Sequence, residues 1–357
     1  MIKIDIKDLK SQLQDSKKII VIPHKNPDGD AIGSSIAINE LLKSLGHKSL
    51  IISPNNFPDF LKWMDDDNEI KIYEEDEEVF SNEILNSDII FTLDFNSLSR
   101  IGKMGEYVKK SKALKVMIDH HQSPENYAKY TYSDVNMSST CEMVYHLISE
   151  LSLGDKINSK IASALYTGIM TDTGSFKFPL TTDLTHKVVS DLIKKGANGS
   201  EINNLVYDNN SCDKLLLLSH TLSNMVVDME HKTAYMYLTQ HSLNKYNFKK
   251  GDTEGFVNYG LSIKGVKFAA IFIENEAEKI IKISLRSKGD FNVNEFSRNN
   301  FNGGGHINAA GGYSSENLEA TLLKFKNLLP NYKNKLCLLY TSPSPRDRTR
   351  SRMPSSA

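Results

Sequence analysis

The stretch from His24 to Ser34 constrains the fold most strongly, because it combines a strand end, a loop and a helix start. The apolar run Ile19–Ile22 before it is short and rich in β-branched residues, which predicts a buried strand. Apolar residues then recur at helical spacing from Ala31 to Leu45, and this pattern predicts a helix that ends at Gly46. The loop between them therefore lies at the edge where α/β folds bind ligands.

Three polar residues on this loop, His24, Asp28 and Asp30, have two interpretations. Asp28 or Asp30 alone can serve as a helix N-cap, which is a common structural role for aspartate. Packed together, the imidazole and the two carboxylates would repel one another or stay poorly satisfied unless a cation held them. The loop is thus a candidate metal site, and both interpretations stay open on these residues alone.

The first part of the chain predicts a parallel α/β sheet. Buried-strand patterns at 48–53, 88–93 and 115–118 alternate with helical segments, and the apolar run 163–170 is helical or extended. The acidic run 74–78 is expected to be a solvated loop or helix face. With the first loop, the expected strand tips carry four polar clusters: His24/Asp28/Asp30, Asp94, Asp119/His120/His121 and Asp172.

The second part predicts a smaller α+β domain, because apolar and polar residues alternate at 229–240, 268–274 and 279–286 as in half-buried strands. The expected organisation is a catalytic domain at 1–210, a linker helix at 211–228 and a second domain at 229–335. Residues 336–357 are expected to be a non-native tail. Four arginines and no lysine lie in 338–357, against three arginines in 1–337.

Composition narrows the class of protein further. A length of 357 residues suits two domains, and a net charge of −1 argues against a large sequence-independent nucleic-acid surface. The three cysteines, Cys141, Cys212 and Cys337, have no paired spacing, and no signal peptide or long apolar span is present. These features predict a soluble cytoplasmic protein that does not bind membranes.

Four acidic or histidine clusters on one parallel sheet favour a metal centre over separate structural roles. Mixed carboxylate and imidazole donors suit Mn²⁺ or a similar first-row ion better than Mg²⁺, because imidazole is a softer ligand than Mg²⁺ favours. The donors suffice for two ions if one carboxylate bridges. Two ions about 3.5–4 Å apart can clamp the oxygens of an in-line displacement at phosphorus.

The order of these motifs resembles the DHH phosphoesterase family. Asp119-His120-His121 is similar to the motif that names the family, and residues 23–34 are similar to its first motif. Residues 93–102 resemble its second motif and 168–174 its fourth, while 303–306 with 309–312 resemble the signature of the accompanying DHHA1 domain. The resemblance runs from about residue 18 to 332 and meets every motif in order.

This resemblance implies a dinuclear centre. Its first ion would be held by His24, Asp28 and Asp94, and its second by Asp30, Asp94, His120 and Asp172, with Asp94 as the bridge. His121 would act near the scissile phosphate as an acid or phosphate ligand, and Asp119 would be an orienting residue of the kind that metal-bound histidines need. The implied cofactors are two Mn²⁺ ions, with Mg²⁺ or Co²⁺ as substitutes.

The second domain is expected to hold a phosphate of the substrate. A triple glycine lets backbone N–H groups approach a phosphate closely, and Arg286 offers a planar guanidinium group. A plain mobile loop is the alternative interpretation of the glycines. The expected substrate-binding residues are Arg100, Arg286, Gly304, Gly305 and His306, with the active site in the cleft between the two domains.

Within the family, the chain resembles small bacterial enzymes that act on very short RNA and on 3′-phosphoadenosine 5′-phosphate (pAp). The expectation is Mn²⁺-dependent hydrolysis of both to mononucleotides by a metal-bridging hydroxide, with a homodimer as the candidate assembly. A cyclic- or linear-dinucleotide phosphodiesterase is the alternative inside the family. A RecJ-like exonuclease would need a further strand-binding domain, a family II pyrophosphatase would lack the glycine loop, and a nucleotide-binding regulator would have a broken ligand set.

Overall fold

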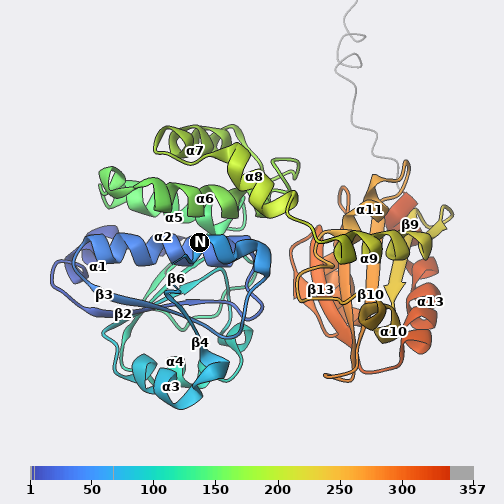
Figure 1. Ribbon diagram of the computed structural model, residues 1–357, viewed down its shortest axis with the longest axis horizontal. Coiled ribbons are helices and arrows are strands. Elements are labelled where there is room, and N and C mark those ends of the chain that lie inside the picture. The colour runs from blue at the N-terminus through green and yellow to red at the C-terminus, as the bar shows by residue number, and fades with distance from the viewer. Residues whose placement is uncertain (1, 4, 67, 338–357) are drawn as a thin grey trace, which may run out of the picture. The chain divides into compact units, whose positions relative to one another are not determined.

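The computed structural model describes residues 2–3, 5–66 and 68–337, so the predicted tail at 338–357 lies outside the described residues. The chain divides into two compact units (Figure 1). Of the described residues, the first takes in those up to 211 with 249–251, and the second takes in 212–248 with 252–337. Within the described ranges, no helix combines the length and apolar character needed to cross a bilayer.

A seven-stranded sheet forms the centre of the first unit, in the order β1-β7-β6-β5-β2-β3-β4. The six strands from β7 to β4 are parallel, which confirms the predicted parallel sheet, and β1 pairs antiparallel with β7. The strands are β1 (Ile2–Lys3), β2 (Lys18–Pro23), β3 (Lys48–Ser53), β4 (Ile70–Ile72), β5 (Ile89–Leu93), β6 (Leu114–Asp119) and β7 (Tyr130–Ser133). Strands β3 and β4 follow β2 on one side of the sheet, whereas β5, β6 and β7 follow on the other side. The strand order therefore reverses between β2 and β5, and parallel sheets bind ligands at this topological switch point.

Helices cover both faces of this sheet (Figure 1). Helices α2 (Gly29–Ser44), α5 (Thr140–Glu150) and α6 (Ser159–Asp172) share one apolar core with the sheet, and α3 (Glu77–Leu85) and α4 (Met104–Lys110) share the core on the other face. The remaining helices of the unit are α1 (Ile6–Gln12), α7 (Asp183–Lys194) and α8 (Gly199–Tyr207), with 3₁₀ turns at Asp59–Met64, Tyr73–Glu75, Leu98–Ile101 and Gly154–Lys156.

One predicted strand tip is wrong. Asp172 is the last residue of helix α6, and residues 163–170 lie inside that helix. Helix α6 is buried along most of its length, from Ile161 to Met170. An apolar run that is buried on nearly all sides carries little periodicity, so its pattern alone does not separate helix from strand.

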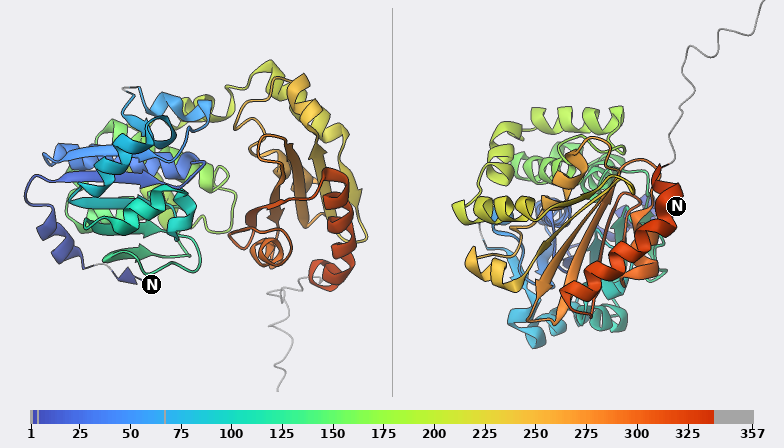
Figure 2. Two further views of the ribbon diagram at one scale, coloured as in Figure 1. Left: turned by 90° about the horizontal axis from the view of Figure 1, so that it is seen from below. Right: turned by 90° about the vertical axis from the view of Figure 1, so that its right-hand side faces the viewer.

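The second unit is built on a six-stranded sheet in the order β12-β13-β11-β10-β9-β8, in which β9 and β10 are parallel and all other neighbours antiparallel. Its strands are β8 (Val226–Asp228), β9 (Thr233–Leu238), β10 (Phe268–Asn275), β11 (Ile280–Ser287), β12 (Gly304–Gly305) and β13 (Ala309–Ser314). Its helices are α9 (Cys212–Ser223), α10 (Gln240–Lys245), α11 (Phe256–Ser262), α12 (Val293–Asn300) and α13 (Leu318–Cys337). Figure 2 shows α13 crossing the face of this sheet, so the unit has the mixed α+β character that the sequence predicts.

The central strand β10 differs from the expected half-buried pattern. Phe268, Ala270 and Phe272 face one core, which α12 and α13 cover, and Ala269 and Ile271 face another core, which α9, α10 and α11 cover. Because helices cover both faces of the sheet, consecutive residues of this strand are buried instead of alternating between buried and exposed. Leu336, which falls in the predicted tail, lies in α13 and is fully buried in the first of these cores.

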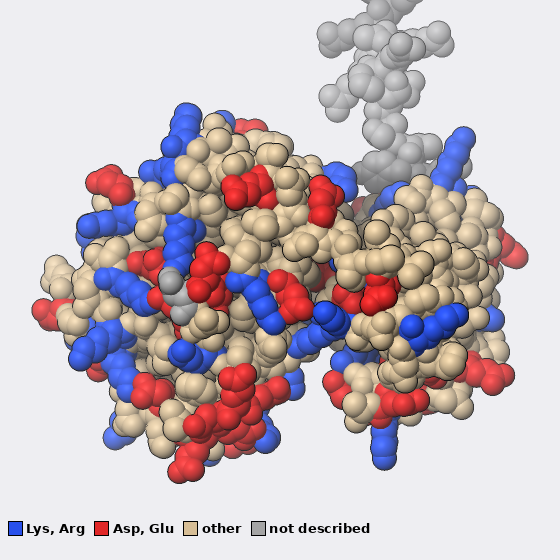
Figure 3. Space-filling view, viewed as in Figure 1, with Lys and Arg blue, Asp and Glu red and all other residues tan. Residues whose placement is uncertain are grey.

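Charges of both signs are interspersed on the face of the first unit that Figure 3 shows, in keeping with the net charge of −1. Acidic side chains gather over the end of this unit where α3 lies (Figures 1 and 3). The run Glu74–Glu78 is exposed there, as the sequence predicts for a solvated segment.

Candidate metal centre

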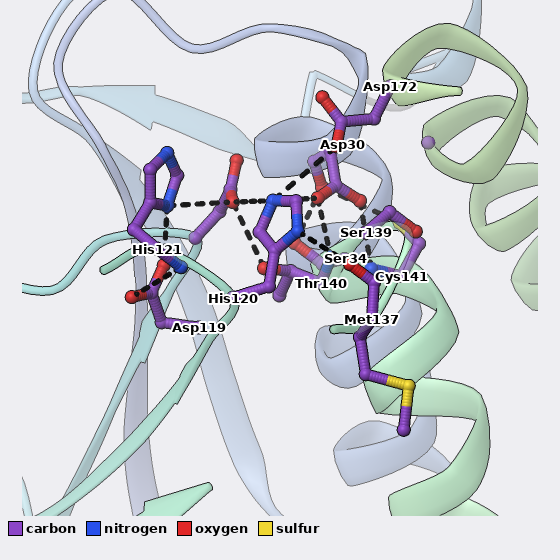
Figure 4. A network of polar contacts seen from close by, with 12 residues as sticks. Asp30, Ser34, Asp119, His120, His121, Met137, Ser139, Thr140, Cys141 and Asp172 are labelled. Carbon is purple, nitrogen blue, oxygen red and sulfur yellow. Dashed lines mark hydrogen bonds and ion pairs between the residues drawn. The ribbon is translucent and has the colours of Figure 1, made fainter. Parts of the chain in front are cut away.

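The carboxyl ends of β2, β5 and β6 bring the predicted metal ligands of the first unit together with the start of α5 and the end of α6. Figure 4 shows Asp30, His120 and Asp172 pointing toward one another from three different elements. Among residues of the first unit, three groups have ligand atoms within 4.8 Å of one another: His24 with Asp28 and Asp94, Asp30 with His120 and Asp172, and Asp94 with Asp119 and His121. The structure thus gathers all eight residues of the four predicted clusters.

The first group forms around His24. Its Nε2 lies 3.4 Å from Oδ2 of Asp94 and 3.8 Å from Oδ1 of Asp28. Asp28 is also the N-cap of α2, because its Oδ1 accepts the backbone N–H groups of Asp30 and Ala31 at 3.1 Å each. The two interpretations of the first loop are therefore compatible, since one carboxylate both caps the helix and faces the histidine.

The second group forms around His120. Its Nε2 lies 3.4 Å from Oδ2 of Asp172, 3.5 Å from Oδ1 of Asp94 and 3.8 Å from Oδ2 of Asp30. Asp30, Asp94 and His120 are buried, whereas Asp172 stays partly exposed. This group therefore has a protected interior and one more accessible carboxylate.

Asp94 belongs to both groups. It follows β5 with a φ of 65°, a left-handed conformation that few residues other than glycine adopt. Its backbone N–H donates to the carbonyl of Ile118 at 3.0 Å, which holds the turn against β6. The unusual backbone conformation directs one carboxylate between two histidines, and strained conformations of this kind persist where surrounding structure determines them.

The ring orientation of both histidines fits a metal centre. Nδ1 of His24 donates to the carbonyl of Lys25 at 2.9 Å, and Nδ1 of His120 donates to the carbonyl of Met137 at 3.2 Å. These bonds place the lone pair of each ring on Nε2, which faces oxygens of Asp94. A lone pair and a carboxylate oxygen at this spacing repel unless a cation or proton lies between them, and the spacing suits two ligands at about 2.1 Å from one ion.

The pKa shifts of these groups show that the buried carboxylates stabilise positive charge at this site. Burial alone would lower the pKa of His24 and His120, but the facing carboxylates raise it to about 10 and about 9. Burial raises the pKa of Asp30 well above its usual value and that of Asp172 to about 6. Burial would also raise the pKa of Asp94, but the histidines hold it well below its usual range. Protons and metal ions therefore compete for the same lone pairs.

Asp119 and His121 form a separate pair beside these groups. Asp119 ends β6, and its Oδ1 accepts Nδ1–H of His121 at 2.6 Å while its Oδ2 accepts the backbone N–H of His121 at 3.1 Å. Nδ1 of His121 is 3.7 Å from Oδ1 of Asp94. Asp119 thus orients His121, whereas the carbonyl of Met137 orients His120.

Sequence reasoning missed the start of α5. Thr140 and Cys141 donate backbone N–H groups to the carboxylate of Asp30, and the hydroxyl of Thr140 donates to Asp94. A signal for this helix start was present, because Ser139 and Glu142 have the spacing of a capping box. Ser139 indeed caps α5 by accepting the N–H of Glu142 at 3.1 Å.

The predicted substrate-binding residues occupy two places. Arg286 lies on β11 opposite Ala309, whose carbonyl accepts the N–H of His306 at 2.7 Å, so these residues are neighbours in the second unit. Gly304 and Gly305 form β12 beside them. In the first unit, Arg100 lies in the turn Leu98–Ile101, and its carbonyl accepts the N–H of Lys25 at 2.8 Å.

Arg298 is a further cation in the second unit that the sequence analysis did not single out. Its Nε donates to Oδ1 of Asn294 at 3.0 Å. A Cβ placed on Gly304 would lie 3.7 Å from that Nε, so the guanidinium group borders the glycine loop.

Comparisons with known proteins agree with this arrangement. Residues 18–169 match the DHH family, N-terminal domain, and residues 230–330 match the DHHA1 domain. The chain is 29% identical to the bifunctional oligoribonuclease and PAP phosphatase NrnA of Bacillus subtilis, over 87% of this chain and 94% of that protein. It is 26% identical to the cyclic-di-AMP phosphodiesterase GdpP of the same organism, over 91% of this chain and 49% of that protein. The crystal structure of an exopolyphosphatase-related protein from Bacteroides fragilis superposes with a TM-score of 0.88 at 39% identity, over 93% of this chain and 97% of that one.

Proposed function

The chain belongs to the DHH and DHHA1 family of phosphoric ester hydrolases, and on this premise we propose that it hydrolyses very short oligoribonucleotides and pAp to mononucleotides. The residues His24, Asp28, Asp30, Asp94, His120 and Asp172 would hold two Mn²⁺ ions, with Mg²⁺ or Co²⁺ as substitutes. When bound, such ions lower the pKa of water and neutralise the oxygens of the phosphate under attack.

The position of Asp94 is the observation that carries this proposal. Its Oδ2 faces His24 and its Oδ1 faces His120, so one carboxylate is shared by two groups of ligands. A carboxylate shared between two groups of ligands is expected in a site for two ions and not in a site for one ion. In-line displacement at phosphorus uses two ions about 3.5–4 Å apart.

His121 is the proposed acid of the reaction. Its Nδ1 proton is engaged by Asp119 at 2.6 Å, so the proton that it exchanges with the leaving oxygen is the one on Nε2. Because both the ring and the backbone N–H of His121 bind the same carboxylate, the ring has a defined direction before substrate arrives.

In the second unit, we propose that Arg286, His306 and the backbone N–H groups of Gly304 and Gly305 bind a phosphate that is not cleaved. A guanidinium group and glycine N–H groups are donors that match phosphate oxygens. Both pAp and a short 5′-phosphorylated RNA carry such a second phosphate, which supports these substrates over a simple monoester. Arg100 is the proposed contact from the first unit.

A second candidate is hydrolysis of cyclic or linear dinucleotides, and the similarity to the cyclic-di-AMP phosphodiesterase GdpP favours the cyclic substrate. The same ligands would serve this reaction, so only competition between substrates separates the two. A nucleotide-binding regulator without catalysis would have a broken ligand set, which the complete groups around His24 and His120 do not support, and it would show binding in Mn²⁺ with no turnover.

The deciding experiment incubates the chain with Mn²⁺ and an equimolar mixture of pAp, pGpG, pApA, cyclic di-AMP and a longer RNA, and follows each product. We expect pAp and the linear dinucleotides to be consumed first. Preferential loss of cyclic di-AMP, or of the linear dinucleotides with pAp left intact, would favour the second candidate, and consumption of the longer RNA first would contradict both.

Asp94→Ala tests the dinuclear centre in the same assay. We expect turnover of every substrate to vanish, because one substitution removes a ligand from both groups of donors. Asp183→Ala is the matched control, since Asp183 is an exposed carboxylate paired with Lys187 on α7. Near-normal activity of Asp94→Ala would contradict the dinuclear proposal.

We further propose a cytoplasmic enzyme with a catalytic first domain at 1–210, a linker at 211–228 whose helix α9 packs on the core of the second unit, and a substrate-binding second domain at 229–335. The free cysteines Cys141, Cys212 and Cys337 fit a reducing compartment. A homodimer stays a prediction that sedimentation of the purified chain tests.

A further inference from the structure

Thr140 contacts carboxylates of both groups of ligands, although it is not itself a ligand. It is the first residue of α5 and is fully buried. Its backbone N–H donates to Oδ2 of Asp30 at 2.6 Å, and its hydroxyl donates to Oδ1 of Asp94 at 3.0 Å. The next residue, Cys141, donates its N–H to Oδ1 of Asp30 at 2.8 Å.

The hydroxyl of Thr140 is not needed to cap its helix. Ser139 is the N-cap of α5, and its side chain accepts the N–H of Glu142. The bond of the Thr140 hydroxyl therefore goes across the fold to Asp94, 46 positions away, rather than to the helix that carries it. This is the geometry of a residue that orients another side chain.

The oxygen that Thr140 contacts is the one turned toward the second group. Oδ1 of Asp94 is 3.5 Å from Nε2 of His120, whereas Oδ2 is 3.4 Å from Nε2 of His24. A donor fixed on Oδ1 prevents the carboxylate from rotating to offer both oxygens to the first group. The contact thus keeps one oxygen available to each group.

We propose that Thr140 is a positioning residue that maintains Asp94 as the bridge and so sets the affinity of the second metal ion, the one held by Asp30, Asp94, His120 and Asp172. This inference rests on the proposed dinuclear function. Partners that orient ligands typically contribute about 10–100-fold to metal affinity. Loss of the hydroxyl should therefore weaken the second ion by about this factor and leave the first ion nearly unchanged.

The test is a Mn²⁺ titration of the metal-free full-length chain, with free Mn²⁺ followed by electron paramagnetic resonance. Thr140→Val removes the hydroxyl at similar volume, Thr140→Ser keeps it, and Thr140→Ala removes it with less bulk if the valine variant does not fold. Thr221→Val is the control, because the Thr221 hydroxyl is fully buried in the second unit and donates only to the carbonyl of Leu217.

We expect two ions in the wild type and in Thr140→Ser, and a second ion bound about 10–100-fold more weakly in Thr140→Val and Thr140→Ala. Equal loss of both ions, or two ions with wild-type affinity in these variants, would overturn the proposed role of Thr140 but leave the dinuclear function standing. A wild-type chain that binds a single ion would overturn the dinuclear function and this inference with it.

Discussion

Nδ1 of His121 lies 2.6 Å from Oδ1 of Asp119, and the backbone N–H of His121 donates to Oδ2 of the same buried carboxylate. Through these two hydrogen bonds the carboxylate of Asp119 faces His121. His120 between them turns instead toward Asp30 and Asp172. The three consecutive residues Asp119, His120 and His121 therefore have different proposed roles. The proposed acid His121 is oriented by Asp119, which lies outside the two groups of ligands centred on His24 and His120.

Asp119→Asn should separate catalysis from metal binding. The amide keeps the size of the side chain but loses the charge that orients His121, so we expect kcat to fall about 10–100-fold with unchanged Mn²⁺ affinity. The measurements are kcat on pAp and a Mn²⁺ titration, with Asp155→Asn on the exposed turn Gly154–Lys156 as control. A variant that loses Mn²⁺ as well would place Asp119 among the metal ligands.

Gly168→Ala should disturb the centre through packing. A Cβ on Gly168 would lie 2.2 Å from Sγ of Cys141 and 2.9 Å from Oδ1 of Asp30, so either these two buried side chains or helix α6 would have to shift. We expect a loss of about 1–3 kcal/mol in the free energy of unfolding and weaker Mn²⁺ binding. Gly154→Ala is the control, since a Cβ there meets nothing within 4 Å. Equal melting temperatures for the two variants would refute the argument.

The metal-free chain should lose stability as pH rises. His24 and His120 have pKa values of about 10 and about 9 in the fold, against 6.5 in the unfolded chain, so each binds its proton more tightly when folded. Their contribution is complete below pH 6.5 and is lost as pH rises through 9 and 10. Melting temperatures in a chelator should therefore fall over this range.

Saturating Mn²⁺ should reverse this trend, because metal ions displace the same protons and bind more tightly as pH rises. His24→Gln should reduce the slope of the metal-free profile. A metal-free melting temperature that stays level or rises between pH 6.5 and 9 would contradict the assignment of these two histidines.

Arg286→Ala should affect substrates with a second phosphate selectively. Losing a charge-assisted contact costs roughly 1.5–3 kcal/mol, which is about ten- to a hundredfold in kcat/KM for pAp. Bis-p-nitrophenyl phosphate has no distal phosphate and should be much less affected, and Mn²⁺ binding should not change. An equal loss on both substrates would mean that Arg286 acts on the phosphoryl group under attack.

Removal of residues 338–357 should leave stability and activity unchanged if they are a non-native tail. The shortened chain should end after Cys337, because α13 extends to that residue and Leu336 is buried in the core of the second unit. The comparison is of melting temperature and kcat/KM. A lower value of either for the shortened chain would show that the tail belongs to the protein.

The sequence by itself determined the parallel sheet of the first unit and the position of most proposed ligands. Runs such as Ile19–Ile22 and Ile89–Leu93 are buried on both faces, and they stop at residues that break strands. Polar residues directly after them must lie at the carboxyl edge, whatever the details of packing. His24, Asp94 and Asp119 could therefore be placed from local pattern alone.

Only the tertiary structure decided which of these residues meet. Asp172 reaches the centre from the end of a helix that packs against α2, and Thr140 reaches Asp30 across 110 positions of the chain. Hydrophobic periodicity indicates which face of each segment is buried. The contacts of Asp172 and Thr140 depend instead on how closely α2, α5 and α6 approach one another. That approach is set by volumes at residues such as Gly33 and Gly168, where a single added carbon would collide with a neighbouring helix, and no local pattern encodes it.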